Sequence, residues 1–219
     1  GPGRGFMGIR LRALTSVGAA LAVVGGPAAI ADAAPPTVRS GMQISIDETI
    51  LTVNNCTLGA VISRGKALTA GHCGALGRAV RDRHGNRIGT VAANHVGRKL
   101  DVAVISLAPR AEIRVDEIDW QPGFVRGQVV TKNGIATGSG RGKVTDPVPA
   151  VRTSAGFSLA PPFVDVHESY TISTTLRSEM GDSGAGVRNA RGRVVGILSS
   201  GTADGARVVP LSKLPKALR

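Results

Sequence analysis

Three residues of this sequence could together activate a serine nucleophile, and they occur along the chain in the order His72, Asp101 and Ser183. A serine hydroxyl reacts poorly near neutral pH unless a base removes its proton, and imidazole has an unperturbed pKa suited to that task. His72 follows the small residues Ala70 and Gly71, which would leave its ring accessible at the end of a strand. His72 is therefore the candidate general base.

Asp101 opens the apolar run 101–105. Burying a carboxylate without a partner is costly, but beside an imidazole it would hold the correct tautomer and stabilise the imidazolium. We interpret Asp101 as the partner of His72. The alternative is an aspartate at the start of a strand that faces solvent.

Ser183 lies in the glycine-rich segment 179–186. Glycines beside a serine permit a tight turn, which would aim the N–H groups of Gly181 and Ser183 at one point where an oxyanion could form. An ordinary glycine-rich turn would explain the glycines, but it would not explain why the other two segments occur in the same chain.

The elements that must position these residues read as short strands. The chain has 30 glycines and only 3% aromatic residues, and short apolar runs alternate with turn signals. We expect an all-β fold, with a crossover at 108–128 and a short helix within 211–218. The predicted strands are 57–62, 67–70, 79–83, 87–92, 102–107, 129–131, 138–142, 194–199 and 207–209.

The N-terminal residues 1–33 have the three-part layout of a secretory signal. Arg10 and Arg12 follow the expected initiator Met7, an apolar run covers 13–24, and small residues precede a cleavage site before Ala34. We interpret residues 1–6 as a cloning remnant or a mis-set start. An uncleaved anchor is the alternative, although the apolar run is short for a membrane span. We expect a secreted protein.

Export would place Cys56 and Cys73 where a disulfide persists. With two cysteines there is one possible pairing, and such a bridge would stabilise the fold by about 3 kcal/mol. The alternative, free thiols that bind metal or act as nucleophiles, lacks clustered partners. We expect no metal and no cofactor, because no His/Cys/Asp cluster has ligand spacing.

The net charge of +12 is scattered along the chain. This distribution favours a solvated basic surface over a dedicated anion-binding face. We expect no nucleic-acid partner. His84, His95 and His167 are expected on turns or loops, and no role is assigned to them.

Segments 68–73, 101–105 and 181–184 together resemble the chymotrypsin-like serine proteases, and the bacterial branch with the streptogrisins and α-lytic protease is the nearest match. Segments 56–59, 134–138 and 195–201 also resemble that branch. The resemblance implies two packed six-stranded antiparallel β-barrels in a domain spanning 34–219, with the first barrel at about 40–110 and the second at about 125–210.

The same resemblance implies a secreted, monomeric serine endopeptidase that hydrolyses proteins or peptides through an acyl-enzyme. His72, Asp101 and Ser183 would be its catalytic triad, and Gly181 and Ser183 its oxyanion hole. Ser199 would donate to Asp101, and the backbone from Ser199 to Gly201 would pair with an extended substrate. No stable membrane anchor is expected.

Several positions depart from the branch. Ala185 replaces a usual glycine, Thr131 and Arg141 stand where a second disulfide is common, and Arg177 stands where a third bridge has a cysteine. No folded pro-segment lies between Ala34 and the body of the domain.

Two alignments of the specificity pocket remain open. One places Arg177 at its floor and favours acidic side chains. The other lines the pocket with Met180 and Ser200 and favours small or medium aliphatic side chains, and we lean towards it.

Two other functions were weighed. An α/β-hydrolase esterase would have its nucleophile first in the chain, which is the reverse of the order found. A catalytically silent relative could bind an acidic polymer or a cell-envelope component, but it would need neither triad nor oxyanion donors.

Overall fold

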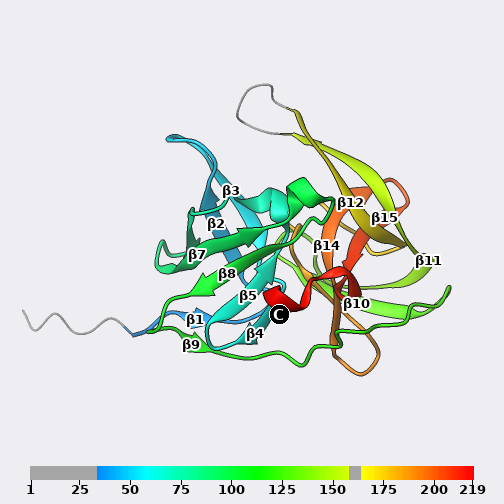
Figure 1. The fold of residues 1–219 in the computed structure, drawn as a ribbon, viewed down its shortest axis with the longest axis horizontal. Coiled ribbons are helices and arrows are strands. Elements are labelled where there is room, and N and C mark those ends of the chain that lie inside the picture. Colours follow the sequence, from blue (N-terminus) through cyan, green and yellow to red (C-terminus); the bar gives the residue numbers. More distant parts are fainter. Residues whose placement is uncertain (1–33, 158–163) are drawn as a thin grey trace, which may run out of the picture. The chain divides into compact units, whose positions relative to one another are not determined.

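The computed structural model describes residues 34–157 and 164–219, and these residues form β-strands joined by turns and a few 3₁₀ turns (Figure 1). The predicted secretory signal, residues 1–33, lies outside the described residues. In the described part of the chain no helix has the length and apolar character needed to cross a membrane.

The first half of the domain is a seven-stranded sheet in the order β3-β2-β6-β7-β8-β5-β4. Its neighbours pair antiparallel, as the predicted hairpins around 63–66 and 84–86 require. The strands are β2 (Gln43–Asp47), β3 (Val53–Thr57), β4 (Ala60–Ser63), β5 (Lys66–Thr69), β6 (Ala79–Asp82), β7 (Arg87–Asn94) and β8 (Ala103–Leu107).

The sheet has seven strands rather than the expected six because one strand is interrupted at Leu58 and Gly59. The two end strands of the sheet, β3 and β4, are separated only by these two residues. Across the break, the amide of Leu58 donates to Met42 and the amide of Gly59 donates to Leu68. The sheet therefore curls back on itself, and the predicted barrel is recovered when β3 and β4 are read as one bent strand.

Gly59 is required at this bend by a close approach of the second half of the domain. A Cβ at this position would lie 2.2 Å from the carbonyl oxygen of Gly184. No side chain fits there, so the first barrel can meet the nucleophile segment backbone to backbone.

The second half is a closed six-stranded barrel in the order β10-β11-β12-β15-β14-β13. All its pairs are antiparallel. Its strands are β10 (Val129–Gly134), β11 (Gly138–Phe157), β12 (Val164–Thr174), β13 (Gly186–Arg188), β14 (Val194–Thr202) and β15 (Gly205–Pro210).

The long hairpin of β11 and β12 was not predicted beyond residue 142. Its pairing shifts register between Val144, Asp146 and Ala150, in the stretch that contains Pro147 and Pro149. Proline has no N–H to donate and is confined to edges and bulges of sheets, so the hairpin has no regular apolar alternation to reveal it.

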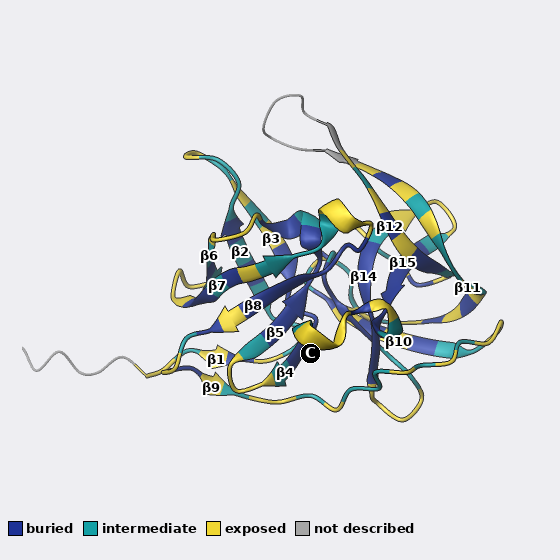
Figure 2. Cartoon of the chain, viewed as in Figure 1, coloured by how far each residue is buried: buried dark blue, intermediate teal, exposed yellow. Residues whose placement is uncertain are grey.

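Each half has its own cluster of buried aliphatic side chains, and strand interiors are the most buried parts of the chain (Figure 2). In β14, the residues from Val194 to Ser199 are all buried. Val194 and Ile197 belong to the first cluster and Val195 and Leu198 to the second, so β14 contributes to both cores.

The expected crossover at 108–128 contains little regular structure. Its short strand β9 (Glu112–Ile113) pairs in parallel with β1 (Thr37–Val38). The expected C-terminal helix is two 3₁₀ turns, η4 (Leu211–Lys213) and η5 (Lys216–Leu218), separated by Leu214 and Pro215.

Candidate functional site

His72 lies in the 3₁₀ turn η2 (Gly71–Cys73), directly after β5. The predicted disulfide between Cys56 and Cys73 is confirmed and ties this turn to β3. Asn94 at the end of β7 donates to the carbonyls of Gly71 and Gly74, on either side of His72. The backbone that carries the imidazole is thus fixed from two strands, β3 and β7.

Asp101 has no exposed surface and contacts His72 twice. Its Oδ1 accepts from the backbone N–H of His72 at 2.8 Å, and its Oδ2 lies 2.7 Å from Nδ1 of the imidazole. Ser199 of β14 donates its hydroxyl to the same Oδ2 at 2.6 Å, the contact that the resemblance implied. The carboxylate therefore fixes both the position and the tautomer of His72.

The pKa of Asp101 falls well below its ordinary value. Burial alone would raise that pKa, but the charge of His72 and the contacts with His167 and His72 outweigh it. Asp101 is therefore an anion throughout the neutral range, and it can stabilise a protonated imidazole.

Ser183 lies in the turn between β12 and β13 and lines one cleft together with His72. Its hydroxyl is 3.4 Å from the carbonyl oxygen of Ser199. In the described part of the chain, the amides of Gly181 and Ser183 donate to no acceptor, whereas those of Asp182 and Gly184 donate to Glu179 and Leu198. Two N–H groups are left available beside the hydroxyl.

Two glycines allow this turn. Gly181 has φ +106° and Gly184 has φ +91°, both in the region that disfavours side chains. A Cβ on Gly184 would also lie 2.2 Å from the hydroxyl oxygen of Thr69. The turn can therefore adopt its shape and pack against the first barrel only with glycine at these positions.

Asp182 anchors the same turn from beneath and was not predicted to do so. Its Oδ1 accepts from the amides of Ala136 and Thr137, and its Oδ2 accepts from the Thr137 hydroxyl and the Glu179 amide. Burial works to raise the pKa of Asp182, but these hydrogen bonds lower it overall, that of the Thr137 side chain most. The buried Nζ of Lys132 lies 4.0 Å away.

The cleft has a volume of about 1560 Å³, and most of the predicted substrate-binding residues line it: Met180, Ser199, Ser200 and Gly201. Arg177 does not line this cleft. Its side chain is 74% exposed and bonds to Glu179. Ser154 of β11 lines the cleft as well and shares a hydrogen bond of 2.6 Å with Ser200.

His167 is a second residue of the site whose position the sequence did not reveal. It was expected on a turn or loop, but it lies within β12 opposite Ser154, and its Nε2 is 3.1 Å from Asp101 Oδ2. Its position follows from the register of the β11–β12 hairpin, which had no sequence signal. His84 does lie in a turn, and His95 lies between β7 and η3 (Val96–Arg98).

The fold and the site together define a double-barrel hydrolase with a serine, histidine and aspartate at the junction of its barrels. The sequence matches the Trypsin family over residues 34–211, which is more than half of the chain, so the protein belongs to that family. It is a serine endopeptidase.

Solved structures of bacterial proteases share the fold. Chymotrypsin of Cellulomonas bogoriensis has a TM-score of 0.57 at 22% identity, with 83% of this chain and 95% of that chain covered. Protease A of Thermobifida fusca has a TM-score of 0.57 at 19% identity, with 81% and 94% covered. A glutamic acid specific serine protease described as using a histidine triad in substrate binding has a TM-score of 0.59 at 18% identity, with 82% and 97% covered. Among curated proteins, none matches the sequence.

Proposed function

We propose that this protein hydrolyses peptide bonds through an acyl-enzyme on Ser183, with His72 as general base and Asp101 as its partner. The observation that carries the proposal is the pair of contacts between Asp101 and His72, made in the cleft that Ser183 also lines. A carboxylate that holds Nδ1 leaves Nε2 as the basic nitrogen.

In the first step the Ser183 hydroxyl oxygen attacks the peptide carbonyl carbon, and its proton passes to Nε2 of His72. The imidazolium then gives this proton to the leaving amine, and the C–N bond breaks to leave an ester on Ser183. Water repeats the sequence on the ester, with His72 again taking and returning the proton, and releases the acid product.

The negative oxygen of each tetrahedral intermediate would be bound by the N–H groups of Gly181 and Ser183. Both of these amides have no acceptor among the described residues. Because the Asp182 carboxylate holds the turn from beneath, the donors need little rearrangement as charge develops.

For the residue before the cleaved bond we propose small or medium aliphatic side chains. A Cβ on Gly201 would lie 2.8 Å from the Ser178 carbonyl oxygen, so the walls at these residues approach closely. Ser154 and Ser200 add only paired hydroxyls, and Arg177 is not among the residues that line the cleft.

Secretion belongs to the same proposal. A disulfide beside the candidate base is stable in an oxidising compartment, and residues 1–33 have the layout of an export signal.

The test is labelling of the purified full-length chain with a fluorophosphonate probe, together with hydrolysis of a peptide library. We expect labelling of the native protein and none of Ser183→Ala, with cleavage after Ala, Val or Leu. If neither protein is labelled, the chain is a silent relative that binds rather than cuts. Cleavage after Asp or Glu would refute the proposed aliphatic specificity. Arg177→Gln is the matched control and should keep the native cleavage profile.

A further inference from the structure

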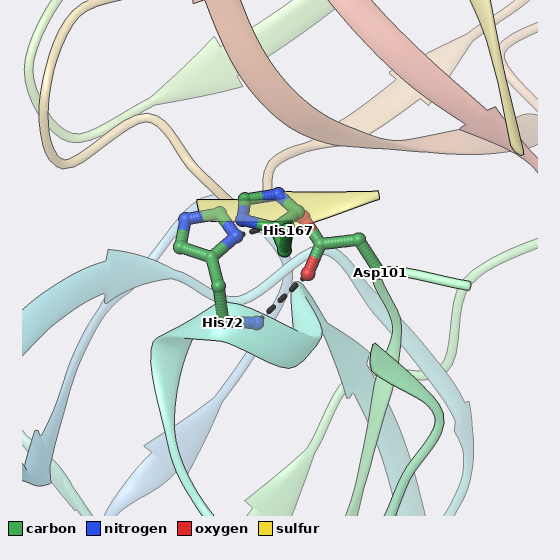
Figure 3. A group of neighbouring side chains, drawn as sticks. All are labelled: His72, Asp101 and His167. Carbon is green, nitrogen blue, oxygen red and sulfur yellow. Dashed lines mark hydrogen bonds and ion pairs between the residues drawn. The ribbon is translucent and has the colours of Figure 1, made fainter. Parts of the chain in front are cut away.

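Asp101 is bordered by two imidazoles, of which the proposed chemistry uses one. Figure 3 shows the rings of His72 and His167 beside the same carboxylate. The ring centroids are 4.8 Å apart and the ring planes differ by 16°. Candidate ligand atoms of His72, Asp101 and His167 all lie within 4.8 Å of one another.

Both ring nitrogens of His167 are buried, although the residue as a whole is partly exposed. Its side chain is 9% exposed, and neither ring nitrogen has a hydrogen-bond partner within the described residues. Nε2 lies 3.1 Å from Asp101 Oδ2, and this contact helps to lower the pKa of that carboxyl. Buried polar atoms are normally satisfied, so a nitrogen in this state beside a carboxylate indicates a ligand site.

We propose that His72, Asp101 and His167 bind a zinc ion, and that the bound ion switches the protease off. The site itself is independent of the proposed function. The switch rests on the assignment of His72 as the base.

The donor set fits zinc better than other common cations. Two imidazoles and one carboxylate are typical of zinc sites that keep a fourth position for water, whereas magnesium and calcium prefer oxygen ligands. The three residues come from η2, the loop before β8 and β12, so the cluster forms only on folding. This is why no ligand spacing was visible along the sequence.

The two distances from the carboxylate to the imidazoles require only small adjustments, and the two imidazole nitrogens lie within 4.8 Å of each other. Ligands about 2.1 Å from a tetrahedral ion are about 3.4 Å apart, and Asp101 Oδ2 lies 2.7 Å from His72 Nδ1 and 3.1 Å from His167 Nε2. Ser199 can keep its hydrogen bond to Oδ2. The fourth ligand would be water, because His72 and His167 both line the open cleft.

Inhibition follows from the tautomer of His72. When Nδ1 gives its lone pair to the metal, the single proton of the neutral ring must sit on Nε2. That nitrogen is the one that should accept the Ser183 proton, so the hydroxyl is no longer activated. The ion would also occupy the oxygen that stabilises the imidazolium.

Zinc binding is measured by calorimetry on the full-length Ser183→Ala protein, which reports the site even if the chain hydrolyses nothing. We expect binding at one site, weakened about 100-fold by a further His167→Phe change, since a three-ligand site loses one ligand. His167→Cys, which restores a ligand, should recover most of the affinity. His84→Gln, on an exposed turn, is the matched control and should bind as tightly as its parent.

In the Ser183-containing protein, zinc should inhibit peptide hydrolysis and a chelator should restore it, and His167→Phe should be at least tenfold less sensitive. Equal zinc affinity with and without His167 would overturn the proposal. Equal affinity for magnesium would overturn the choice of metal. If binding depends on His167 but zinc does not inhibit, the site stands and the switch is refuted.

Discussion

Asp101 and Asp182 are two buried carboxylates, one beside His72 and the other within the turn of Ser183, and both have a lowered pKa. Around Asp101 the side-chain partners are two imidazoles and a serine hydroxyl. Around Asp182 they are backbone amides and a threonine hydroxyl, with a lysine at 4.0 Å.

The difference concerns what can change during a reaction. Amides and hydroxyls keep their charge at every pH of interest, so the region of Asp182 is a fixed scaffold for the nucleophile turn. Imidazoles gain and lose protons near neutral pH, so the region of Asp101 can respond to a proton that moves. The site thus combines one carboxylate whose partners are fixed with another whose partners can exchange protons.

Replacing Asp101, the carboxylate with imidazole partners, should have the largest effect on catalysis. Asp101→Asn keeps the shape but no longer holds the productive tautomer of His72, so kcat/KM for peptide hydrolysis should fall by about 10⁴. Steady-state kinetics on a peptide substrate would measure it, with circular dichroism as the check on folding. A well-folded variant within tenfold of the native rate would contradict the role of Asp101.

Replacing Asp182 should reduce kcat less than replacing Asp101 does. Asp182→Asn removes acceptors from the turn that carries Gly181 and Ser183, and disordered oxyanion donors typically cost about 10²–10³ in kcat. KM should change little, because the backbone expected to pair with the substrate is that of Ser199 to Gly201 in β14. A variant with a raised KM and an unchanged kcat would show that Asp182 acts on substrate binding.

The disulfide ties the turn that carries His72 to β3. Removing it by Cys56→Ala with Cys73→Ala should lower the free energy of unfolding by about 3 kcal/mol, measured by urea titration. Ser139→Ala, on the second barrel, is the control. An unchanged midpoint would mean that the turn at His72 is held by Asn94 and packing alone.

Lowering the pH should change the difference in stability between the native protein and Asp182→Asn. Because the folded-state pKa of Asp182 is below the ordinary 3.8, its stabilisation is fully present above that value and is lost as pH falls towards the folded pKa. The stability difference between the native protein and Asp182→Asn should therefore shrink as pH drops from 5 towards 3. A difference independent of pH would exclude the charge of Asp182 as its source.

The smallest effect is expected where the barrels meet behind the nucleophile. Thr57 donates its hydroxyl to the Gly181 carbonyl at 2.9 Å and accepts from the Ile135 amide at 3.0 Å. Thr57→Val should lower the free energy of unfolding by about 1–2 kcal/mol and kcat by a few fold. Thr153→Val, on an exposed strand position, should change neither.

The sequence predicted the parts of the site that have local signals. His72 follows a hairpin with clear turn residues, Asp101 opens a strand, and glycines surround Ser183, so each segment was recognisable without its neighbours. The disulfide followed from there being two cysteines. The strands β4 to β8 of the first barrel were predicted for the same reason, whereas β2 and most of β3 were missed.

What escaped prediction depends on contacts across the fold. His167 reaches Asp101 only through the register of β11 and β12, whose prolines and irregular pairing hide the strands. Asp182 was read only as a neighbour of the nucleophile, because the amides of Ala136 and Thr137 that donate to it are more than forty residues away in sequence. The break at Leu58 and Gly59 likewise follows from the approach of the second barrel.

Strand β14 ties both halves of the machinery to a single stretch of backbone. Its pairing with β15 shifts register between Leu198 and Ser200. Ser199, between them, donates its hydroxyl to Asp101 and accepts the Ser183 hydroxyl at its carbonyl. A change of chain length within this strand would rotate Ser199 away from Asp101 and Ser183 at once. The exposed turn at 203–204 contacts neither of these residues. Over evolutionary time, length variation should therefore accumulate at that turn and be purged from the strand beside it.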